Sequence, residues 1–201
     1  MMRIAVGISG ATGAIYGIRI LETLYRLGVQ VHLVISDAAK KTIEMETNYT
    51  IRQVEDMATE VHDNSNVGAS IASGSFMTHG MIVAPCSIKS LSAIANSFNT
   101  NLLVRAADVV LKEKKKLVLI VRETPLHLGH LRLMSNVAEI GGVILPPMPA
   151  FYNLPETIDD IINQTVGKAL DQFDIKHDLF NRWHGSEYLQ TIKKKREKNA
   201  I

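Results

Sequence analysis

Short apolar runs alternate with longer amphipathic segments along most of this chain. Runs rich in Val and Ile predict strands buried on both faces: Ile4–Ser9, Val29–Ser36, Met81–Pro85, Leu117–Arg122 and Val143–Pro146. Segments with apolar residues at helical spacing predict helices: Ala14–Leu27, Asp37–Glu46, Ile88–Ser97, Asn101–Lys114, His130–Ile140 and Glu156–Phe173. This alternation predicts an α/β fold, in which helices cover both faces of a parallel sheet.

Residues at the ends of the helical segments agree with this interpretation. Ser36 and Ser87 stand just before helices, where a hydroxyl can cap free backbone amides. Gly141-Gly142 follows the fifth helix, as a C-terminal cap does. Pro155 precedes the sixth helix, where the missing N–H of proline costs nothing.

Composition indicates one soluble globular domain. The chain has 201 residues, of which 46% are hydrophobic and 21% charged, which is ordinary for that class. The net charge of +2 is too small to attract nucleic acid or an anionic membrane, so we expect neither as a partner. We also expect no membrane span and no signal peptide. Cys86 is the single cysteine, which predicts a reducing, cytoplasmic location without disulfides.

A charge run, Lys193-Lys194-Lys195-Arg196-Glu197-Lys198, stands near the end of the sequence. It lacks accompanying aromatic or glycine residues, so it favours a solvated helix end over a nucleic-acid site. We predict one domain over residues 1–185, followed by a basic tail over residues 186–201.

The turn after the first strand carries Gly7-x-x-Gly10-x-x-Gly13. A helix that follows such a turn can hold a phosphate. The spacing is not G-x-G-x-x-G, and the second strand ends in Ile35-Ser36-Asp37 rather than in a clear ribose-binding acid. NAD is therefore a poor fit, and a single phosphate or flavin mononucleotide (FMN) fits better. The alternative is that the glycines only allow close packing of helix on strand.

Two further strand ends carry polar groups. In VAPCSIKSLSAI, residues 83–94, Ser87, Lys89 and Ser90 open a helix, and such hydroxyls, amides and one cation suit a phosphate monoester. Cys86 is interpreted as a small buried hydrophobe rather than a nucleophile. Arg122-Glu123 follows a core strand and is either a structural ion pair or part of a site.

The sequence predicts no metal site. The Asp-rich D-D-x-x-D pattern of one class of magnesium site is absent from the sequence. His127 and His130 have a spacing that allows metal binding, but no further ligand type clusters with them. We expect both to be structural or surface residues.

Several motifs in order resemble the flavin prenyltransferase family, UbiX. They are GISGATGAIYGIRIL, METNY, APCSIKSLSAIA, RAADVVLKEKKKLVLIVRETPL and GGVILPPMPAFYNLPETIDD. The resemblance runs from about residue 3 to residue 183. The stretch PPMPAFYN…DQF is similar to the branch associated with phenolic-acid (UbiD-type) decarboxylases.

This resemblance implies a Rossmann-like or flavodoxin-like fold in a homo-oligomer, usually a dodecamer. It implies a metal-independent transfer of the dimethylallyl group from dimethylallyl monophosphate to N5 and C6 of reduced FMN. The prenylated flavin would then serve a UbiD-type decarboxylase as its cofactor.

The resemblance also implies site residues by motif. Those matched to flavin contacts are Gly10, Ala11, Thr12, Ser36, Ser87, Ile88, Lys89, Ser90 and Arg122. Those matched to the chemistry or its organisation are Glu46, Arg105, Lys112, Glu123 and Trp183. Tyr152 matches a ligand of the prenyl phosphate, and Lys168 stands where the family often has an arginine. Lysine keeps the charge there but loses the bidentate fork.

Apart from the resemblance, these residues allow plainer interpretations. Arg105 and Asp108 could form a surface pair, and Lys112 could belong to a solvated basic face. A non-catalytic FMN-binding or delivery subunit of a decarboxylase remains an alternative function. A flavin-dependent cysteine decarboxylase is disfavoured because its P-x-[MA]-N-x-x-M-W type segment is absent from the sequence.

Overall fold

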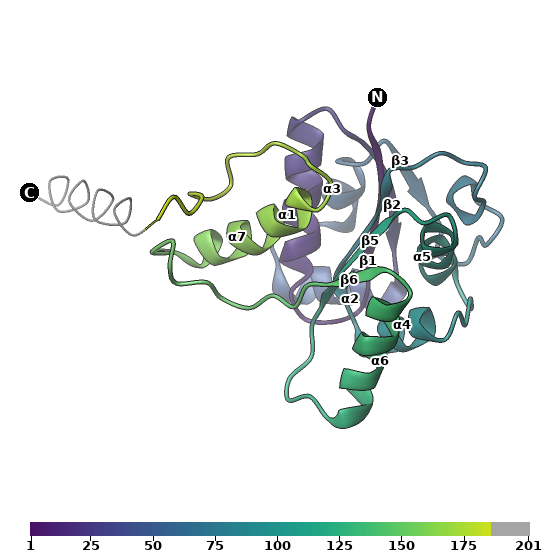
Figure 1. The fold of residues 1–201 in the computed structure, drawn as a ribbon. Helices are drawn as coiled ribbons and strands as arrows, with labels where there is room; N and C mark the ends of the chain where they lie inside the picture. The colour runs from purple at the N-terminus through teal and green to yellow at the C-terminus, as the bar shows by residue number, and fades with distance from the viewer. Residues whose placement is uncertain (186–201) are drawn as a thin grey trace, which may run out of the picture.

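A six-stranded, fully parallel sheet forms the centre of the protein (Figure 1). The computed structural model describes residues 1–185, so the predicted tail over residues 186–201 lies outside the described residues. The strands follow the spatial order β3-β2-β1-β4-β5-β6. Their bounds are β1 Arg3–Ile8, β2 Gln30–Ile35, β3 Glu60–His62, β4 Gly80–Cys86, β5 Lys116–Val121 and β6 Gly142–Ile144.

Helices cover both faces of this sheet, as predicted. One face packs against α1 (Ala14–Arg26), α2 (Asp37–Glu46), α3 (Ile51–Glu55) and α7 (Ile158–Asp171). The other face packs against α4 (Ile88–Ala95), α5 (Leu102–Lys112), α6 (Leu128–Glu139) and the 3₁₀ turn η1 (Ser70–Ala72). Because the inner strands β1, β4 and β5 are covered on both sides, their side chains are apolar on both faces, and the alternation of a half-exposed strand is missing there.

The strand order reverses direction between β1 and β4. The chain runs outward from β1 through β2 to β3, then returns to the other side of β1 and continues through β4 and β5 to β6. Loops that leave neighbouring strands in opposite directions open a crevice at the carboxyl ends of the strands, which is where ligands bind in open α/β sheets. The Rossmann-like topology therefore locates the expected site between the loops after β1 and β4.

The structure corrects several predicted bounds. The fifth helix begins at Leu128 rather than His130, with His127 as its N-cap, and the last begins at Ile158, with Thr157 as its N-cap. The segments β3, α3 and η1 were not predicted. Each is three to five residues long, which is too short for a periodic pattern to emerge.

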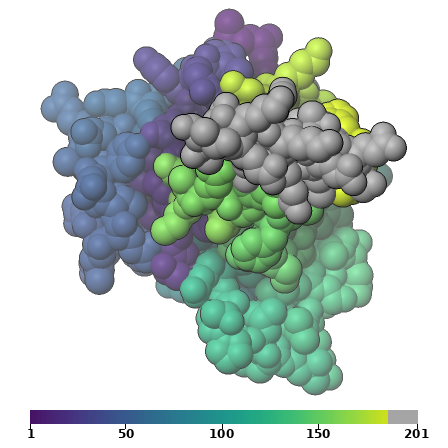
Figure 2. Space-filling model, turned by 90° about the vertical axis from the view of Figure 1, so that its left-hand side faces the viewer, coloured from purple at the N-terminus to yellow at the C-terminus, as the bar shows by residue number. Residues whose placement is uncertain are grey.

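The segment after α7 returns to the surface of α1. Figure 2 shows this segment, in yellow, beside the N-terminal part of the chain. An ion pair joins Arg26 Nη2 to Asp178 Oδ1 at 3.2 Å, and Leu179 packs against the core of that face. Within the described residues, no helix combines the length and apolar character that crossing a membrane requires.

Candidate functional site

A cavity of about 420 Å³ lies at the carboxyl ends of the strands. Loops that follow five strands, β1 to β5, and the start of α5 contribute to its wall. The predicted site residues in that wall are Gly10, Ser36, Ser87, Ile88, Lys89, Ser90 and Glu123. The structure therefore brings together four loops that the sequence separates by up to about a hundred residues. The volume lies within the range of about 300–1,000 Å³ usual for small-molecule sites.

Three helices point their N-termini toward this cavity. Ser36, Ser87 and Asn101 cap α2, α4 and α5, and each accepts a hydrogen bond from the amide three residues later. These bonds satisfy the third amide of each helix and leave the first amides of α2 and α4 without an intrahelical partner. The positive ends of three helix dipoles thus converge on one cavity, which favours an anion.

Charged side chains at this cavity are of both signs. Lys89 is the one basic residue in the wall as the described residues form it, while Asp37 and Glu123 are acidic. The carboxylate of Glu123 accepts a hydrogen bond from the amide of Thr124 at 3.0 Å. Backbone amides and one lysine therefore provide most of the attraction for a phosphate.

Ser9 fastens the loop after β1 to the loop after β4. Its hydroxyl donates to the carbonyl of Pro85 at 2.9 Å and accepts from the amide of Ser87 at 2.8 Å. The residue is 1% exposed. Because these bonds cross the switch point of the sheet, they hold the helix N-terminus of α4 in place. Ser9 was not predicted as a site residue, because its hydrogen-bond partners lie 76 and 78 positions away in the sequence.

The glycines of the first loop allow close approach of neighbouring backbone. A Cβ on Gly10 would lie 2.3 Å from Cβ of Ala38, and one on Gly17 would lie 2.3 Å from the carbonyl oxygen of Ala84. Gly13 has a φ of 95°, a conformation that disfavours other residues. The packing interpretation of these glycines is thus supported, alongside the contribution of Gly10 to the cavity.

Glu46 occupies the N-terminus of α1. One carboxylate oxygen accepts hydrogen bonds from the amides of Gly13 at 2.7 Å and Ala14 at 3.4 Å. A phosphate at this helix would have to displace that carboxylate, so the expected anion position shifts to α2 and α4. Thr12 is exposed beside Glu46, and neither it nor Ala11 belongs to the cavity wall.

Arg122 lies close to α1. Its amide donates to the carbonyl of Cys86 at 3.0 Å, which continues the ladder past β5. Burial raises the pKa of Tyr16, and the charge of Arg122 acts in the opposite direction on that phenol. Arg122 does not line the cavity, whereas the next residue, Glu123, does.

Arg105 and Lys112 stay apart from the cavity within one chain. Arg105 donates to the carbonyl of Ala72 at 3.2 Å and pairs with Asp108 at 3.1 Å. Lys112 forms an ion pair with Glu113 at the C-terminal end of α5. That end leads into the start of β5, at the amino ends of the strands, whereas the cavity lies at their carboxyl ends.

Tyr152, Lys168 and Trp183 belong to a second group near α7. The rings of Tyr152 and Trp183 meet edge to face with centroids 5.9 Å apart. The amide of Gln164, one helical turn before Lys168, donates to the hydroxyl of Tyr152 at 3.4 Å. Lys168 Nζ lies 4.0 Å from Asp171 Oδ2. The predicted prenyl-phosphate ligands therefore share one surface region.

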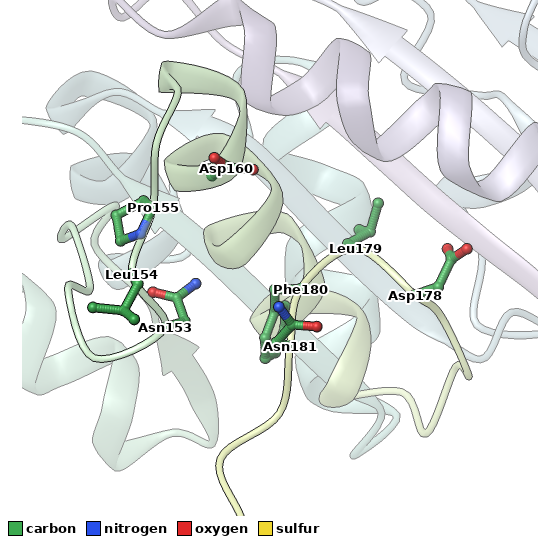
Figure 3. Close-up of a pocket in the computed structure, with 8 residues that line it drawn as sticks. All are labelled: Asn153, Leu154, Pro155, Asp160, Asp178, Leu179, Phe180 and Asn181. Atoms are coloured by element: carbon green, nitrogen blue, oxygen red, sulfur yellow. The ribbon is translucent and has the colours of Figure 1, made fainter. Parts of the chain in front are cut away.

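A pocket of about 210 Å³ lies beside this second group. Figure 3 shows it between the loop 153–155 and the segment 178–181. Among the described residues, Oδ1 of Asn153 is buried without a hydrogen-bond partner. This polar loop follows directly after Tyr152.

Cys86, His127 and His130 have structural roles. Burial raises the pKa of the Cys86 thiol to about 12, so it is an inert core residue, as interpreted. His127 caps α6 by accepting from the amide of Gly129 at 3.0 Å, and its ring lies 3.5 Å, centroid to centroid, from that of His130.

Sequence reasoning missed several residues of the cavity wall: Asp37, Ala38, Asn64, Ala93, Thr100, Asn101 and Val104. Asn64 shows why. It follows β3, which was not predicted. Its backbone carbonyl accepts a hydrogen bond from the amide of Leu102 at 2.8 Å, and its side-chain Oδ1 accepts one from the amide of Leu103 at 3.1 Å. The polar residues after His62 could have indicated a loop at a strand end. Because β3 was not predicted, this loop could not be assigned to the carboxyl ends of the strands.

Comparisons with known proteins agree with this geometry. A family model described as Flavoprotein matches residues 1–169. "Flavin prenyltransferase UbiX" of Thauera aromatica is 67% identical over 192 residues, which cover 96% of this chain and 99% of that protein.

Two solved structures are also similar. One is described as AnUbiX (PadA1) in complex with FMN and dimethylallyl pyrophosphate, with a TM-score of 0.90, 49% identity, and coverage of 92% of this chain and 98% of that one. The other is a dodecameric FMN-dependent UbiX-like decarboxylase from Escherichia coli O157:H7, with a TM-score of 0.90, 49% identity, and coverage of 92% and 100%.

Proposed function

The chain belongs to the UbiX family of flavin prenyltransferases, and we propose how its residues carry out that reaction. The enzyme transfers the dimethylallyl group of dimethylallyl monophosphate to reduced FMN. The C–O bond to phosphate breaks, and bonds from the prenyl group to N5 and C6 of the flavin form. The product is the prenylated flavin used by UbiD-type decarboxylases. The convergence of three helix N-termini on the cavity at the β1/β4 switch point carries this conclusion.

The FMN phosphate binds at the start of α2 and α4. Ser36, Ser87 and Ser90 offer hydroxyls there, and Lys89 offers a charge. A phosphate monoester accepts several hydrogen bonds at once, and charge-assisted bonds of this kind are roughly twice as strong as neutral ones. Thr12 and Ala11, on the loop after β1, would then face the isoalloxazine ring that extends from this phosphate.

Glu46 is the candidate proton carrier. It is exposed and held by two backbone amides beside Thr12. In this position the carboxyl group can give a proton to the departing phosphate or accept one from the prenylated flavin. Positioned acid–base groups contribute about 10²–10⁴-fold to rate.

The prenyl phosphate binds near Tyr152 and Lys168, with Trp183 on the apolar side. The edge-to-face contact of Tyr152 and Trp183 supports this proposal. An aromatic face can stabilise the allylic cation that develops as the C–O bond breaks. Lys168, held 4.0 Å from Asp171, gives a point charge rather than a bidentate grip.

A homo-oligomer, which we propose to be a dodecamer like the E. coli structure, would complete this site. Lys112 and Arg105 lie away from the cavity of their own chain, so they can serve the chemistry only from a neighbouring copy. The exposed side chains of Leu126, Leu128 and Leu131 on the projecting α6 region support such assembly (Figure 1), because exposed apolar patches mark interfaces.

The test is a prenylation assay without metal. Purified protein, reduced FMN and dimethylallyl monophosphate are incubated anaerobically in the presence of EDTA. Mass spectrometry should show FMN enlarged by one five-carbon prenyl unit, with release of inorganic phosphate. Unmodified FMN alone would contradict the proposal and favour the delivery-subunit alternative. A Lys112→Ala variant with wild-type turnover would remove that residue from the site.

We also propose a cytoplasmic location. The reaction consumes reduced flavin, and the free thiol of Cys86 is compatible with the same reducing compartment.

A further inference from the structure

A second constellation lies on the sheet away from the residues assigned above. β2 and β3 pair in parallel with His32 opposite Glu60 and Val34 opposite His62. Side chains two residues apart on a strand share a face, and paired residues share it too. The register therefore places His32, Glu60 and His62 on one face at the edge of the sheet, although 28 positions separate the first two.

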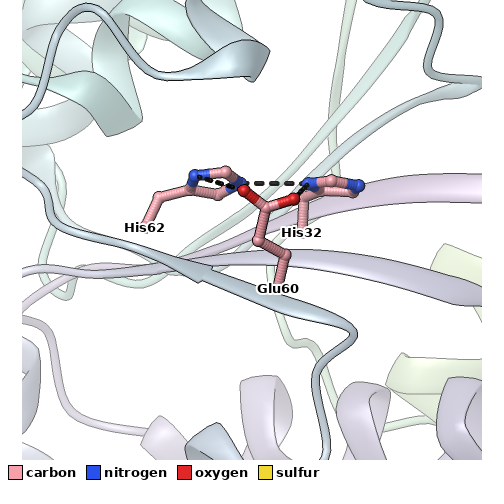
Figure 4. A group of neighbouring side chains, drawn as sticks. All are labelled: His32, Glu60 and His62. Carbon is pink, nitrogen blue, oxygen red and sulfur yellow. Dashed lines mark hydrogen bonds and ion pairs between the residues drawn. The ribbon is translucent and has the colours of Figure 1, made fainter.

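The polar atoms of these three side chains converge. His32 Nδ1 lies 3.0 Å from His62 Nε2 and 3.4 Å from Glu60 Oε2. One ligand atom from each residue lies within 4.8 Å of the other two. Figure 4 shows the carboxylate of Glu60 beside the two imidazoles, which face each other across a short gap. Their rings are nearly parallel, with an interplanar angle of 16°.

The surroundings hold this arrangement in place. His32 is 4% and His62 8% exposed, while the side chain of Glu60 is about half exposed at 53%. Phe76 packs its ring edge-on against His32 with centroids 4.9 Å apart, and the guanidinium of Arg3 lies over the Phe76 ring, 4.7 Å from its centroid. The imidazoles are thus fixed by packing, and the carboxylate side remains open to solvent.

We propose that His32, Glu60 and His62 bind a divalent transition-metal ion, with Zn²⁺ the best fit. Two imidazole nitrogens and one carboxylate oxygen with an open fourth position are a known zinc ligand set. Bonds of about 2.0–2.1 Å in a tetrahedron separate ligand atoms by roughly 3.3 Å. The distances from His32 Nδ1 to His62 Nε2 and to Glu60 Oε2, 3.0 and 3.4 Å, are close to this value, and the 3.6 Å contact between Glu60 Oε1 and His62 is made to its other nitrogen, Nδ1.

The two imidazoles contact each other directly, with His32 Nδ1 3.0 Å from His62 Nε2. The neutral imidazole is the form that coordinates metal. In the metal-free protein a hydrogen bond between the two imidazoles takes the place of the ion.

The site would act on the fold rather than on prenyl transfer. It joins β3, a three-residue edge strand, to β2. The residues that follow, Asp63 and Asn64, line a pocket of about 220 Å³ together with His62, and Asn64 also lines the flavin cavity. A bound ion would therefore clamp the edge strand that positions Asn64.

Metal titration of the full protein tests this proposal. The protein is stripped with EDTA, desalted, and titrated with Co²⁺ and Zn²⁺. We expect one ion per chain, an intense visible Co²⁺ spectrum of a four-coordinate site that Zn²⁺ abolishes, and a rise in unfolding temperature that saturates at the same stoichiometry.

Variants assign the ligands. Glu60→Gln and His62→Ala should each weaken Zn²⁺ binding by at least about tenfold, since even indirect disturbance of a metal site costs 10–100-fold. His127→Asn, which removes an exposed histidine at the start of α6 and keeps a residue that can cap the helix, is the matched control and should bind as the wild type does. Glu60 is exposed enough for its variant to fold even if His62→Ala does not. Absence of stoichiometric binding, or equal binding by wild type and Glu60→Gln, would overturn the proposal.

Discussion

Replacement of Ser9 by alanine should destabilise the protein and loosen its flavin site together. Ser9 is buried, and its hydroxyl forms two hydrogen bonds that join the loop after β1 to the loop after β4. Alanine leaves the carbonyl of Pro85 with the weaker bond from the Ser9 amide at 3.2 Å. The amide of Ser87 loses its partner outright.

The expected cost follows from these two bonds. Each contributes about 1 kcal/mol, and the partly buried amide of Ser87, once unsatisfied, adds part of a desolvation penalty, so the total is about 2–3 kcal/mol. For a chain of this length that corresponds to a fall in unfolding temperature of about 5–10 °C. The N-terminus of α4 also gains freedom, so a loss of about 1.4 kcal/mol there would weaken FMN binding about tenfold.

Urea unfolding at a fixed protein concentration, with flavin fluorescence titration, measures both effects. Ser73→Ala is the matched control, because Ser73 is exposed and its hydroxyl pairs with that of Ser75 at 2.7 Å. It should change stability by no more than about 0.5 kcal/mol. If Ser9→Ala unfolds at the same urea concentration as Ser73→Ala, the proposed role of the Ser9 bonds is refuted.

Other predictions concern chemistry, packing and titration. Glu46→Gln keeps an oxygen for the amide of Gly13 but removes the charge, so turnover should fall about 10²–10⁴-fold while FMN binding persists; unchanged turnover would exclude Glu46 as proton carrier. Gly10→Val should shift the loops, since even a Cβ would lie 2.3 Å from that of Ala38, and cost about 1–3 kcal/mol in urea unfolding. A wild-type midpoint would contradict that contact. With a pKa raised to about 12, Cys86 should resist a thiol reagent at pH 8 until the protein unfolds, and rapid native labelling would disprove its burial.

Asp171, which pairs with His177 and Arg182, makes a pH-dependent contribution to the stability of the fold. Burial alone would raise the pKa of Asp171, but Arg182 and His177 together lower it below its ordinary value. A carboxyl group whose pKa is lower in the folded than in the unfolded protein stabilises the fold at any pH above its unfolded-state pKa. This stabilisation is lost as the pH falls through the folded-state pKa. Asp171→Asn should therefore flatten the loss of stability below about pH 4, measured by acid unfolding; equal acid profiles would contradict this.

Much of the fold could be predicted because its signals are local. Ser36 and Ser87 cap helices through amides three residues away, so a short stretch of sequence contains the whole interaction. Doubly covered strands are apolar on both faces, which makes β1, β2, β4 and β5 visible as continuous runs. β3 escaped because Glu60 and Val61 are exposed on an edge strand, where burial imposes no pattern.

By itself, then, the sequence determined the alternation of strands and helices, their capped ends, the family, and four of the loops that meet at the flavin cavity. Only the tertiary structure decided which residues meet. The strand order brings Ser9 to Pro85, and the register of β2 and β3 brings His32 to His62. The same folding lets the Glu46 carboxylate accept a hydrogen bond from the amide of Gly13, and it places Lys112 at the end of the sheet opposite the cavity. Such contacts depend on how distant strands pair, and the free energy that selects one pairing is spread over the whole core rather than over neighbours in the chain.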